Sequence, residues 1–222
     1  MKESVTTWHR WLQVMLLVLL SLNFAQAKLP GPAAAQQTSV QTIMVLGDSL
    51  SAAYGIPVQQ GWVMRMAARL SAEKRLWRMQ NISISGETTA GGKARIAKAL
   101  ALHKPALVLI ALGANDGLRG LSTEIMQANL LAMVKSSKAS GARVLLIGIR
   151  IPPNYGPDYT AAFEQAFKSV AAAEAIALLP FLLEPIARND AAFQADRLHP
   201  TAAVQAALEK HVFAAVLPLL VK

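Results

Sequence analysis

The sequence predicts an α/β fold in which a mostly parallel, five-stranded sheet is covered by helices on both faces. Three observations support this prediction. Strand and helix signals alternate along the chain, and most of the predicted strands are apolar throughout rather than at every second position. In addition, residues suited to turns follow the first three predicted strands. Alternation of this kind with continuously apolar strands is typical of parallel sheets that are buried on both faces.

The first predicted strand illustrates the strand signal. Residues 42–46 are apolar and partly β-branched, and the run stops at Gly47, as a short buried strand does. Residues 76–84 alternate in polarity, whereas residues 106–112 form a continuous apolar run. The five predicted strands are residues 42–46, 76–84, 106–112, 143–149 and 176–179.

Between these strands, apolar side chains recur at helical spacing. The helix predicted at 90–102 closes at His103-Lys104-Pro105, and the one predicted at 123–139 is followed by Gly141. Proline and glycine beyond the last apolar position are typical stop signals. The five predicted helices are residues 62–70, 90–102, 123–139, 159–174 and 201–217.

The first 27 residues predict a cleavable export signal. Lys2 and Arg10 give a positive start, residues 11–24 are mostly apolar, and Ala25-Gln26-Ala27 form the small-x-small pattern that a signal peptidase recognises. The apolar run is shorter than the about 20 residues of a membrane span, and an uncleaved anchor is the alternative. We expect a signal peptide at 1–27, a flexible leader at 28–39, one domain at 40–222, and a periplasmic or secreted protein.

Composition restricts the classes of partner. The 222-residue chain has 22 Lys and Arg against 13 Asp and Glu, which favours anionic partners. Residues such as Lys93 and Lys98 are nevertheless spaced as on ordinary solvated helix faces, and no nucleic-acid-binding signature accompanies them, so we expect no nucleic acid partner. The chain has no cysteine, no His and carboxylate cluster with metal-ligand spacing and no phosphate-binding glycine loop. We therefore expect no metal and no cofactor.

Two distant motifs predict a nucleophilic site. In Gly47-Asp48-Ser49-Leu50, Ser49 stands one step beyond a strand, at the sheet edge where open α/β folds bind ligands. A serine hydroxyl needs a base and a group that orients the base. Asp196-Arg197-Leu198-His199 provides both within one turn, with His199 as the base and Asp196 as the orienting group. Taken alone, Ser49 could equally cap a helix, and Asp196 could be a surface turn residue.

Four ordered blocks resemble the GDSL, or SGNH, hydrolase family, in particular its bacterial thioesterase and lysophospholipase members. A further stretch, 149–156, resembles a loop of the thioesterase-like branch. The four blocks are Gly47-Asp48-Ser49-Leu50-Ser51, Ser85-Gly86-Glu87-Thr88-Thr89, Gly113-Ala114-Asn115-Asp116-Gly117 and Asp196-Arg197-Leu198-His199-Pro200.

The resemblance implies a three-layer α/β/α, flavodoxin-like SGNH hydrolase fold with Ser49, Asp196 and His199 as catalytic residues. It also implies an oxyanion hole made by the backbone amide of Ser49, by Gly86 and by Asn115. Such donors stabilise the charge that develops on the substrate oxygen. By themselves, Gly86 could be a plain turn residue and Asn115 could form an Asx-turn.

Other polar residues have structural explanations. His103 lies at a predicted helix end, where a cation meets the negative end of the helix dipole. His211 lies inside the last predicted helix, with no acid or serine suitably placed in the sequence. Asp48 and Asp116 are expected to hold neighbouring turns through hydrogen bonds.

The leading functional hypothesis is an exported serine hydrolase that cleaves small-molecule acyl esters, acyl thioesters and lysophospholipids, with transient contact to membrane lipids. Leu118, Leu121, Ile151 and Tyr155, in loops after strand ends, are candidate substrate-binding residues. The alternatives are a polysaccharide deacetylase, a catalytically inactive binding module and a membrane-anchored scaffold. The sequence leaves the oligomeric state and the preferred acyl length open.

Overall fold

The computed structural model describes residues 39–220. The signal peptide predicted at 1–27 lies outside the described residues, and so does the leader predicted at 28–39 apart from Ser39. Both therefore stay predictions.

The core of the structure is a five-stranded sheet with the strand order β2-β1-β3-β4-β5. All four pairs of neighbouring strands are parallel, which confirms the predicted α/β fold class with its central parallel sheet. The strands are β1 (Gln41–Gly47), β2 (Trp77–Asn81), β3 (Leu107–Ala111), β4 (Arg143–Ile147) and β5 (Ala177–Leu179).

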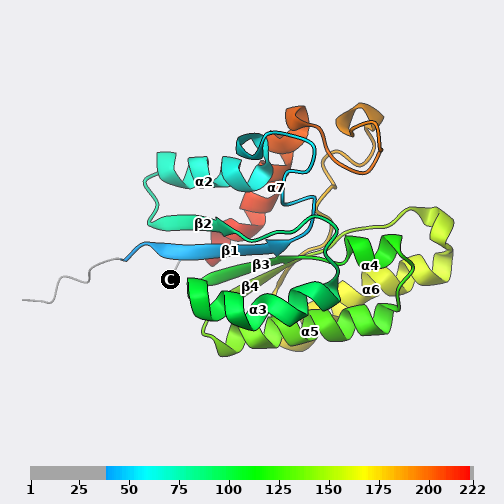
Figure 1. Cartoon of the computed structure of the whole chain (residues 1–222), viewed down its shortest axis with the longest axis horizontal. Helices are drawn as coiled ribbons and strands as arrows, with labels where there is room; N and C mark the ends of the chain where they lie inside the picture. Colours follow the sequence, from blue (N-terminus) through cyan, green and yellow to red (C-terminus); the bar gives the residue numbers. More distant parts are fainter. Residues whose placement is uncertain (1–38, 221–222) are drawn as a thin grey trace, which may run out of the picture. The chain divides into compact units, whose positions relative to one another are not determined.

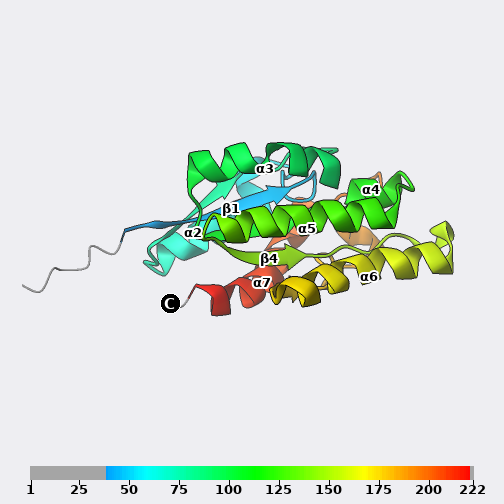
Figure 2. The ribbon, with the colours of Figure 1, turned by 90° about the horizontal axis from the view of Figure 1, so that it is seen from below.

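Helices cover the sheet on both faces and give a three-layer arrangement. Helices α2 and α7 lie on one face, and α3, α5 and α6 lie on the other (Figures 1 and 2). A short helix, α4, follows β3 directly. The helices are α2 (Trp62–Ala72), α3 (Thr89–His103), α4 (Ala114–Leu118), α5 (Thr123–Ala139), α6 (Pro157–Glu174) and α7 (Gln205–Val216).

Burial explains why the central strands are apolar throughout. All five residues of β3 and six of the seven in β1 are buried, because helices cover both faces of these strands. In contrast, β2 is an edge strand whose residues are half-buried or exposed, and its sequence contains Arg78, Gln80 and Asn81. The alternating polarity of residues 76–84 thus reflects the edge position.

Several predicted boundaries differ from the observed ones. β2 ends at Asn81 rather than at residue 84, but the amides of Ile82 and Ile84 still donate to the carbonyls of Val45 and Gly47, so the chain stays extended along β1. Helix α6 begins at Pro157, two residues before the predicted start, because proline is well suited to the first helical position.

The last helix, predicted at 201–217, is divided into a 3₁₀ turn at Ala202–Val204, α7 and a second 3₁₀ turn at Leu217–Leu219. Within residues 39–220, the segment Ala202–Leu219 alone is long and apolar enough to cross a membrane. Leu208, Val212 and Val216 of this segment are completely buried in the core. These side chains pack one face of α7 against the core of the α/β fold.

Strand register brings the candidate residues to one edge of the sheet. Gly47, the last residue of β1, pairs with Ala111, the last residue of β3, and Val45 of β1 pairs with Asn81 at the end of β2. The chain therefore leaves these three adjacent strands at the same carboxyl edge, where Ser49, Gly86 and Asn115 follow.

We predict that Leu109→Ala lowers the free energy of unfolding by about 2–5 kcal/mol, because Leu109 is fully buried in a central strand and its truncation leaves a cavity. Urea unfolding measures the change. Leu102→Ala, at a side chain that is 70% exposed, is the control and should change stability by less than about 0.5 kcal/mol. Equal effects of the two substitutions would contradict the assignment of β3 to the core.

Candidate active site

Ser49 lies in a tight turn directly after β1. The carboxylate of Asp48 accepts a hydrogen bond from the amide of Leu50 at 3.0 Å, and the indole of Trp62 donates to the carbonyl of Leu50 at 3.2 Å. At Gly47, a Cβ would stand 2.8 Å from the Cβ of Ser51, so the turn packs too closely for any larger residue without a shift. Local and long-range contacts together thus hold the Ser49 turn.

Asp196 and His199 form a local unit near the end of the chain. One oxygen of Asp196, Oδ1, accepts from the amides of Leu198 at 2.9 Å and His199 at 3.0 Å. The other, Oδ2, lies 2.7 Å from Nδ1 of His199. The backbone amide of His199, then the imidazole and the Leu198 amide lower the pKa of Asp196 to about 2. Asp196 therefore stays ionised at neutral pH and favours the tautomer of His199 with its proton on Nδ1.

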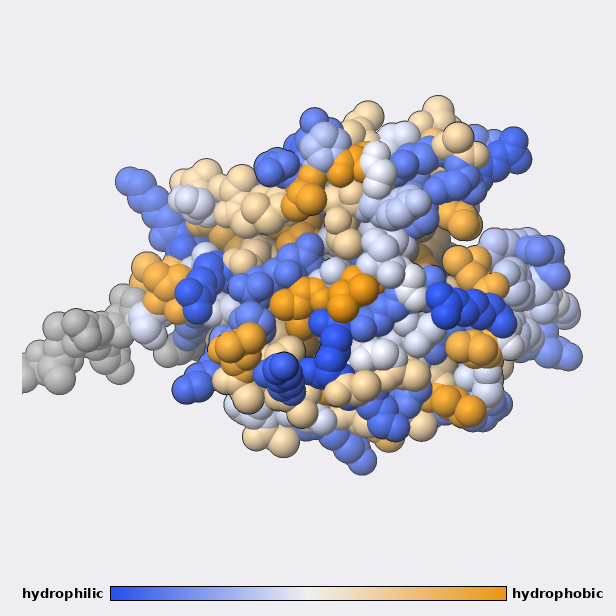
Figure 3. Space-filling model, viewed as in Figure 1, coloured by the Kyte–Doolittle hydropathy of each residue, from blue (hydrophilic) through white to orange (hydrophobic). Residues whose placement is uncertain are grey.

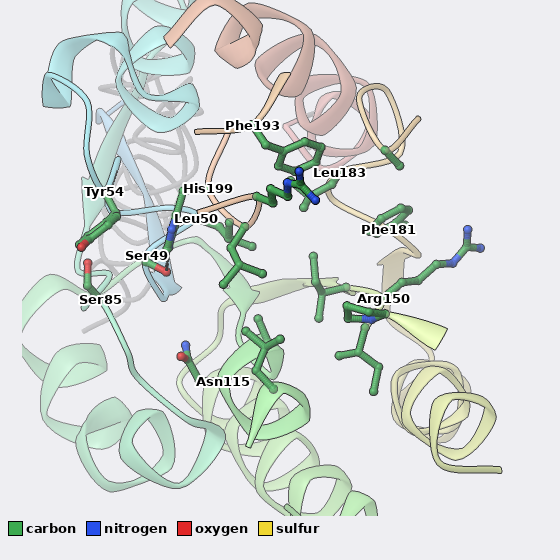
Figure 4. Close-up of a pocket in the computed structure, with 18 of the residues that line it drawn as sticks. Ser49, Leu50, Tyr54, Ser85, Asn115, Arg150, Phe181, Leu183, Phe193 and His199 are labelled. Carbon is green, nitrogen blue, oxygen red and sulfur yellow. Dashed lines mark hydrogen bonds between the residues drawn. The ribbon is translucent and has the colours of Figure 1, made fainter. Parts of the chain in front are cut away.

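The imidazole of His199 connects the two ends of the sequence. Its Nε2 lies 2.8 Å from Oγ of Ser49, although 150 residues separate the two in the chain. The ring of Tyr54 lies beside the imidazole, with the ring centroids 4.5 Å apart. Figure 4 shows Ser49, Tyr54 and His199 together at one side of a pocket. The order Asp196, His199, Ser49 gives a continuous hydrogen-bonded chain that ends on a hydroxyl group.

Gly86 and Asn115 line the same pocket as Ser49 and His199. Gly86 has φ +81°, a left-handed conformation that glycine adopts without a Cβ penalty. The guanidinium of Arg119 donates to the Gly86 carbonyl at 2.9 Å, and Nδ2 of Asn115 donates to the Glu87 carbonyl at 3.0 Å. Because an amide nitrogen carries two hydrogens, Asn115 retains a second donor.

A buried network holds the segment that carries Asn115. The carboxylate of Asp116, which is 3% exposed, accepts from the amide of Thr89 at 2.9 Å and from its hydroxyl at 2.5 Å. The side-chain amide of Asn129 donates to the same hydroxyl at 3.2 Å. These bonds tie α4 to the first turn of α3 and to α5. Asp48 holds its own turn, as predicted, whereas Asp116 bonds to Thr89, 27 residues away at the start of α3, rather than to a neighbouring turn.

The pocket has a volume of about 440 Å³ and a mostly apolar lining. In the space-filling view, hydrophobic side chains border a recess on the side to which the strands point (Figure 3). Ser49, His199 and Asn115 lie at one end of it together with the polar side chains of Tyr54 and Ser85. The apolar lining includes Leu50, Leu118, Ile149, Ile151, Leu183 and Phe193.

The four candidate substrate-binding residues divide into two pairs. Leu118 and Ile151 line the pocket, whereas Leu121 and Tyr155 do not. The hydroxyl of Tyr155 donates to the Leu118 carbonyl at 2.8 Å, and the Leu121 carbonyl accepts from the hydroxyl of Tyr159 at 2.7 Å. The prediction that Tyr155 and Leu121 contact the substrate is therefore not supported by the lining of the pocket, and their hydrogen bonds connect the segments around it.

The two other histidines within residues 39–220 do not line this pocket. His103 ends α3 on the far side of the sheet, and Nε2 of His211 lies 3.0 Å from the carbonyl of Phe181. In the part of the chain that the structure describes, no group of three or more His, Cys, Asp or Glu side chains is placed to hold a metal ion.

Three residues that support the site were missed by sequence reasoning. Trp62 contacts the Ser49 turn, and Tyr54 contacts His199, as described above. The side chain of Gln194 donates to the carbonyls of Tyr54 at 2.9 Å and Pro200 at 3.1 Å, so it joins the two loops that carry Ser49 and His199. Each of these residues lies far in the sequence from one of its partners, and no local pattern reveals such contacts.

Comparisons with known proteins find similar sequences and structures. The model of the GDSL-like lipase/acylhydrolase family matches residues 45–207. The chain is 49% identical over 185 residues to esterase TesA of Pseudomonas aeruginosa, covering 83% of this chain and 92% of that protein. It is 34% identical over 198 residues to thioesterase 1/protease 1/lysophospholipase L1 of Escherichia coli K12, covering 89% and 86% respectively. A crystal structure of AlinE4, an SGNH-hydrolase family esterase, superposes with a TM-score of 0.68 at 32% identity and covers 83% of this chain and 98% of AlinE4.

Asp48 provides a test of the electrostatics beside Ser49. Burial raises the pKa of its carboxyl to about 6, partly opposed by the amide of Leu50 and by His199. Between pH 3.8 and about 6, the native state therefore holds a proton that the unfolded state releases. The contribution of this proton to the free energy of unfolding is complete below pH 3.8 and is lost as the pH rises through about 6. Asp48→Asn removes the buried charge and keeps an acceptor for Leu50.

We predict that Asp48→Asn raises the free energy of unfolding by at most about 3 kcal/mol at pH 8, with the gain shrinking as the pH falls below 6 and vanishing near pH 4. Urea unfolding at pH 4, 6 and 8 measures it. Asp190→Asn, at an exposed carboxylate, is the control and should show no such trend. A gain that is equal at pH 4 and pH 8 would refute this account of Asp48.

Proposed function

The chain belongs to the GDSL-like lipase/acylhydrolase family and is a hydrolase that acts on ester bonds, and we propose that it cleaves acyl esters and acyl thioesters through an acyl-enzyme intermediate on Ser49. The observation that carries the proposal is the chain of short contacts, 2.7 Å from Asp196 to His199 and 2.8 Å from His199 to Ser49. A hydroxyl with a base at hydrogen-bonding distance, and a base oriented by an ionised carboxylate, is the arrangement that activates serine.

In the proposed reaction, Oγ of Ser49 attacks the carbonyl carbon while Nε2 of His199 accepts its proton. Asp196 stabilises the imidazolium that forms, because its carboxylate remains ionised beside Nδ1. Collapse of the tetrahedral intermediate transfers this proton from His199 to the leaving alcohol or thiol. Water then attacks the acyl-enzyme with His199 as the base again, which releases the carboxylic acid and restores Ser49.

The negative oxygen of the tetrahedral intermediate needs hydrogen-bond donors that are in place before the reaction. We assign this role to the backbone amides of Ser49 and Gly86 and to the side chain of Asn115. Asn115 is fixed by its bond to the Glu87 carbonyl and by the buried bond between Asp116 and Thr89, while Arg119 holds the Gly86 carbonyl. Donors held in this way need little reorganisation when charge develops.

The substrate proposal combines the names of the relatives with the pocket. One relative is an esterase and another is a thioesterase and lysophospholipase. The apolar lining beside Ser49, including Leu118 and Ile151, suits an acyl chain. We therefore assign small-molecule acyl esters, acyl thioesters and lysophospholipids as substrates, with transient contact to membrane lipids.

Export is a further part of the proposal. We assign residues 1–27 as a signal peptide that is cleaved near Ala27, residues 28–39 as a leader and residues 40–222 as the single hydrolase domain in the periplasm or beyond. The positive start, the apolar run and the small-x-small pattern of the sequence support this assignment.

We predict that Ser49→Ala abolishes nearly all ester hydrolysis without a loss of stability, because it removes the nucleophile and only one oxygen atom. Turnover of p-nitrophenyl butyrate and labelling by a fluorophosphonate measure the effect, and both should disappear. Ser71→Ala, at an exposed serine of α2, is the matched control and should retain both. Wild-type turnover in folded Ser49→Ala would refute the mechanism, and an unlabelled, inactive wild-type protein would favour a binding module instead.

We predict that kcat/KM rises from acetyl to octanoyl esters, because each methylene buried in the pocket contributes about 0.8 kcal/mol. Leu118→Ser should reduce this preference by several-fold, since Leu118 lines the pocket. Leu121→Ser removes the same side chain from the neighbouring loop outside the lining and should preserve the preference. If the wild type instead prefers acetyl esters or acetylated sugars, a polysaccharide deacetylase replaces this proposal.

A further inference from the structure

We propose that Arg197 binds a phosphate group of the substrate, so that the enzyme selects acyl esters whose alcohol carries a phosphate close to the ester bond. This inference rests on the proposed ester hydrolysis at Ser49. Its evidence is the environment of the arginines around the pocket, the backbone conformation of Arg197 and its position beside His199.

The arginines near the pocket differ in whether the guanidinium has a hydrogen-bond or ion-pair partner. Arg119 donates to the Gly86 carbonyl. Arg150 lies 3.4 Å from the carboxylates of Glu164 and Glu184. By contrast, within residues 39–220 the structure gives the guanidinium of Arg197 no hydrogen bond and no ion pair, although the residue lines the pocket. Arg197 is therefore the lining arginine that can offer its full set of donors to a ligand.

The neighbouring carboxylate does not take up this charge. Asp196 precedes Arg197 directly, but its two oxygens already bond to the amides of Leu198 and His199 and to the imidazole. These bonds keep the carboxylate directed at His199. They leave the adjacent guanidinium without a counter-charge.

The backbone at Arg197 has a conformation that disfavours a side chain. Its φ is +57°, in the left-handed region where glycine is preferred and other residues are strained by roughly 1–3 kcal/mol. Glycine would fit this turn without strain, and the hydrogen bonds of Asp196 would not change because they involve the backbone amides of Leu198 and His199. Within residues 39–220, four other non-glycine residues share a positive φ, so the conformation shows only that this turn does not need the arginine side chain for its fold.

The position of Arg197 in the chain favours an anion close to the ester bond. Arg197 is two residues from His199 in the chain and lines the same pocket as Ser49 and His199. Figure 4 shows Arg150 and Phe181 on the opposite side of this pocket from Ser49 and His199. In a monoacyl glycerophosphate only the three carbons of glycerol separate the ester oxygen from the phosphate ester. The planar fork of guanidinium matches phosphate oxygens in a bidentate arrangement. In coenzyme A thioesters, by contrast, the long pantetheine arm keeps the phosphates far from the reacting carbonyl.

The test compares two soluble esters that differ only in the phosphate, 1-octanoylglycerol and 1-octanoylglycerol 3-phosphate. The measured quantity is the ratio of kcat/KM for the phosphate ester to kcat/KM for the neutral ester. We expect Arg197→Gln to lower this ratio about tenfold, the effect of losing a hydrogen bond to a charged group. Arg197→Lys, which keeps the charge without the fork, should lower it less.

Lys168→Gln is the control for charge, since Lys168 is exposed on α6 and its loss changes the net charge by the same amount. This variant should keep the wild-type ratio. A ratio that Arg197→Gln leaves unchanged overturns the inference. A decrease in kcat/KM of this variant that is confined to octanoyl-CoA also overturns it. Failure of the wild type to hydrolyse even the neutral ester would instead overturn the proposed function, so the two failures are distinguishable.

Discussion

The parallel pairing of β1 with both β2 and β3 is the constraint on which the site depends. Since parallel strands run in the same direction, their carboxyl ends meet at one edge, and the register of Gly47 with Ala111 aligns the ends of β1 and β3. Ser49, Gly86 and Asn115 each follow one of these strands by a few residues. A shift of one residue in either pairing would turn buried side chains to the opposite face and displace the loops together. The buried, apolar central strands thus determine the geometry of polar groups that they do not contain.

Alignment by the sheet is coarse, and long-range hydrogen bonds complete it. Asp116 ties the segment with Asn115 to the start of α3, and Gln194 joins the loop after β1 to the segment with His199. The bonds between Asp116 and Thr89 are buried, where an unsatisfied polar group costs more than in water, whereas the bond from Gln194 to Tyr54 is exposed. The network therefore resists alternative loop conformations, as a site that must hold its donors in place requires.

Two aspartates near Ser49 show how environment decides the charge of one residue type. Asp196 is exposed and accepts hydrogen bonds from two amides and an imidazole, which lowers its pKa to about 2. Asp48 is 2% exposed, and burial raises its pKa to about 6. The first stays ionised beside His199 over the whole physiological range. The second holds the Ser49 turn at a cost in stability that grows as the pH rises, so the turn geometry and global stability are in conflict at this position.

The sequence by itself determined the α/β class and most of the elements, because burial on both faces leaves a local signal in continuous apolar runs. It also predicted that Ser49, Gly86 and Asn115 follow strand ends. That they meet at one edge of the sheet then needs only the parallel arrangement of the strands. Element boundaries were less well predicted: β2 ends at Asn81, because its alternating polarity continues beyond the last regular strand pair.

Only the tertiary structure decided which side chains meet. The motifs predicted His199 as the base for Ser49, but the 2.8 Å contact between them, across 150 residues, is seen only in the folded chain. Leu121 and Tyr155 have the same loop context and apolar character as Leu118 and Ile151, yet only the latter two line the pocket. That the guanidinium of Arg197 has no partner among residues 39–220 is likewise a property of the folded chain. Contacts between distant segments depend on how helices pack on the sheet, and local residue patterns carry no record of that packing.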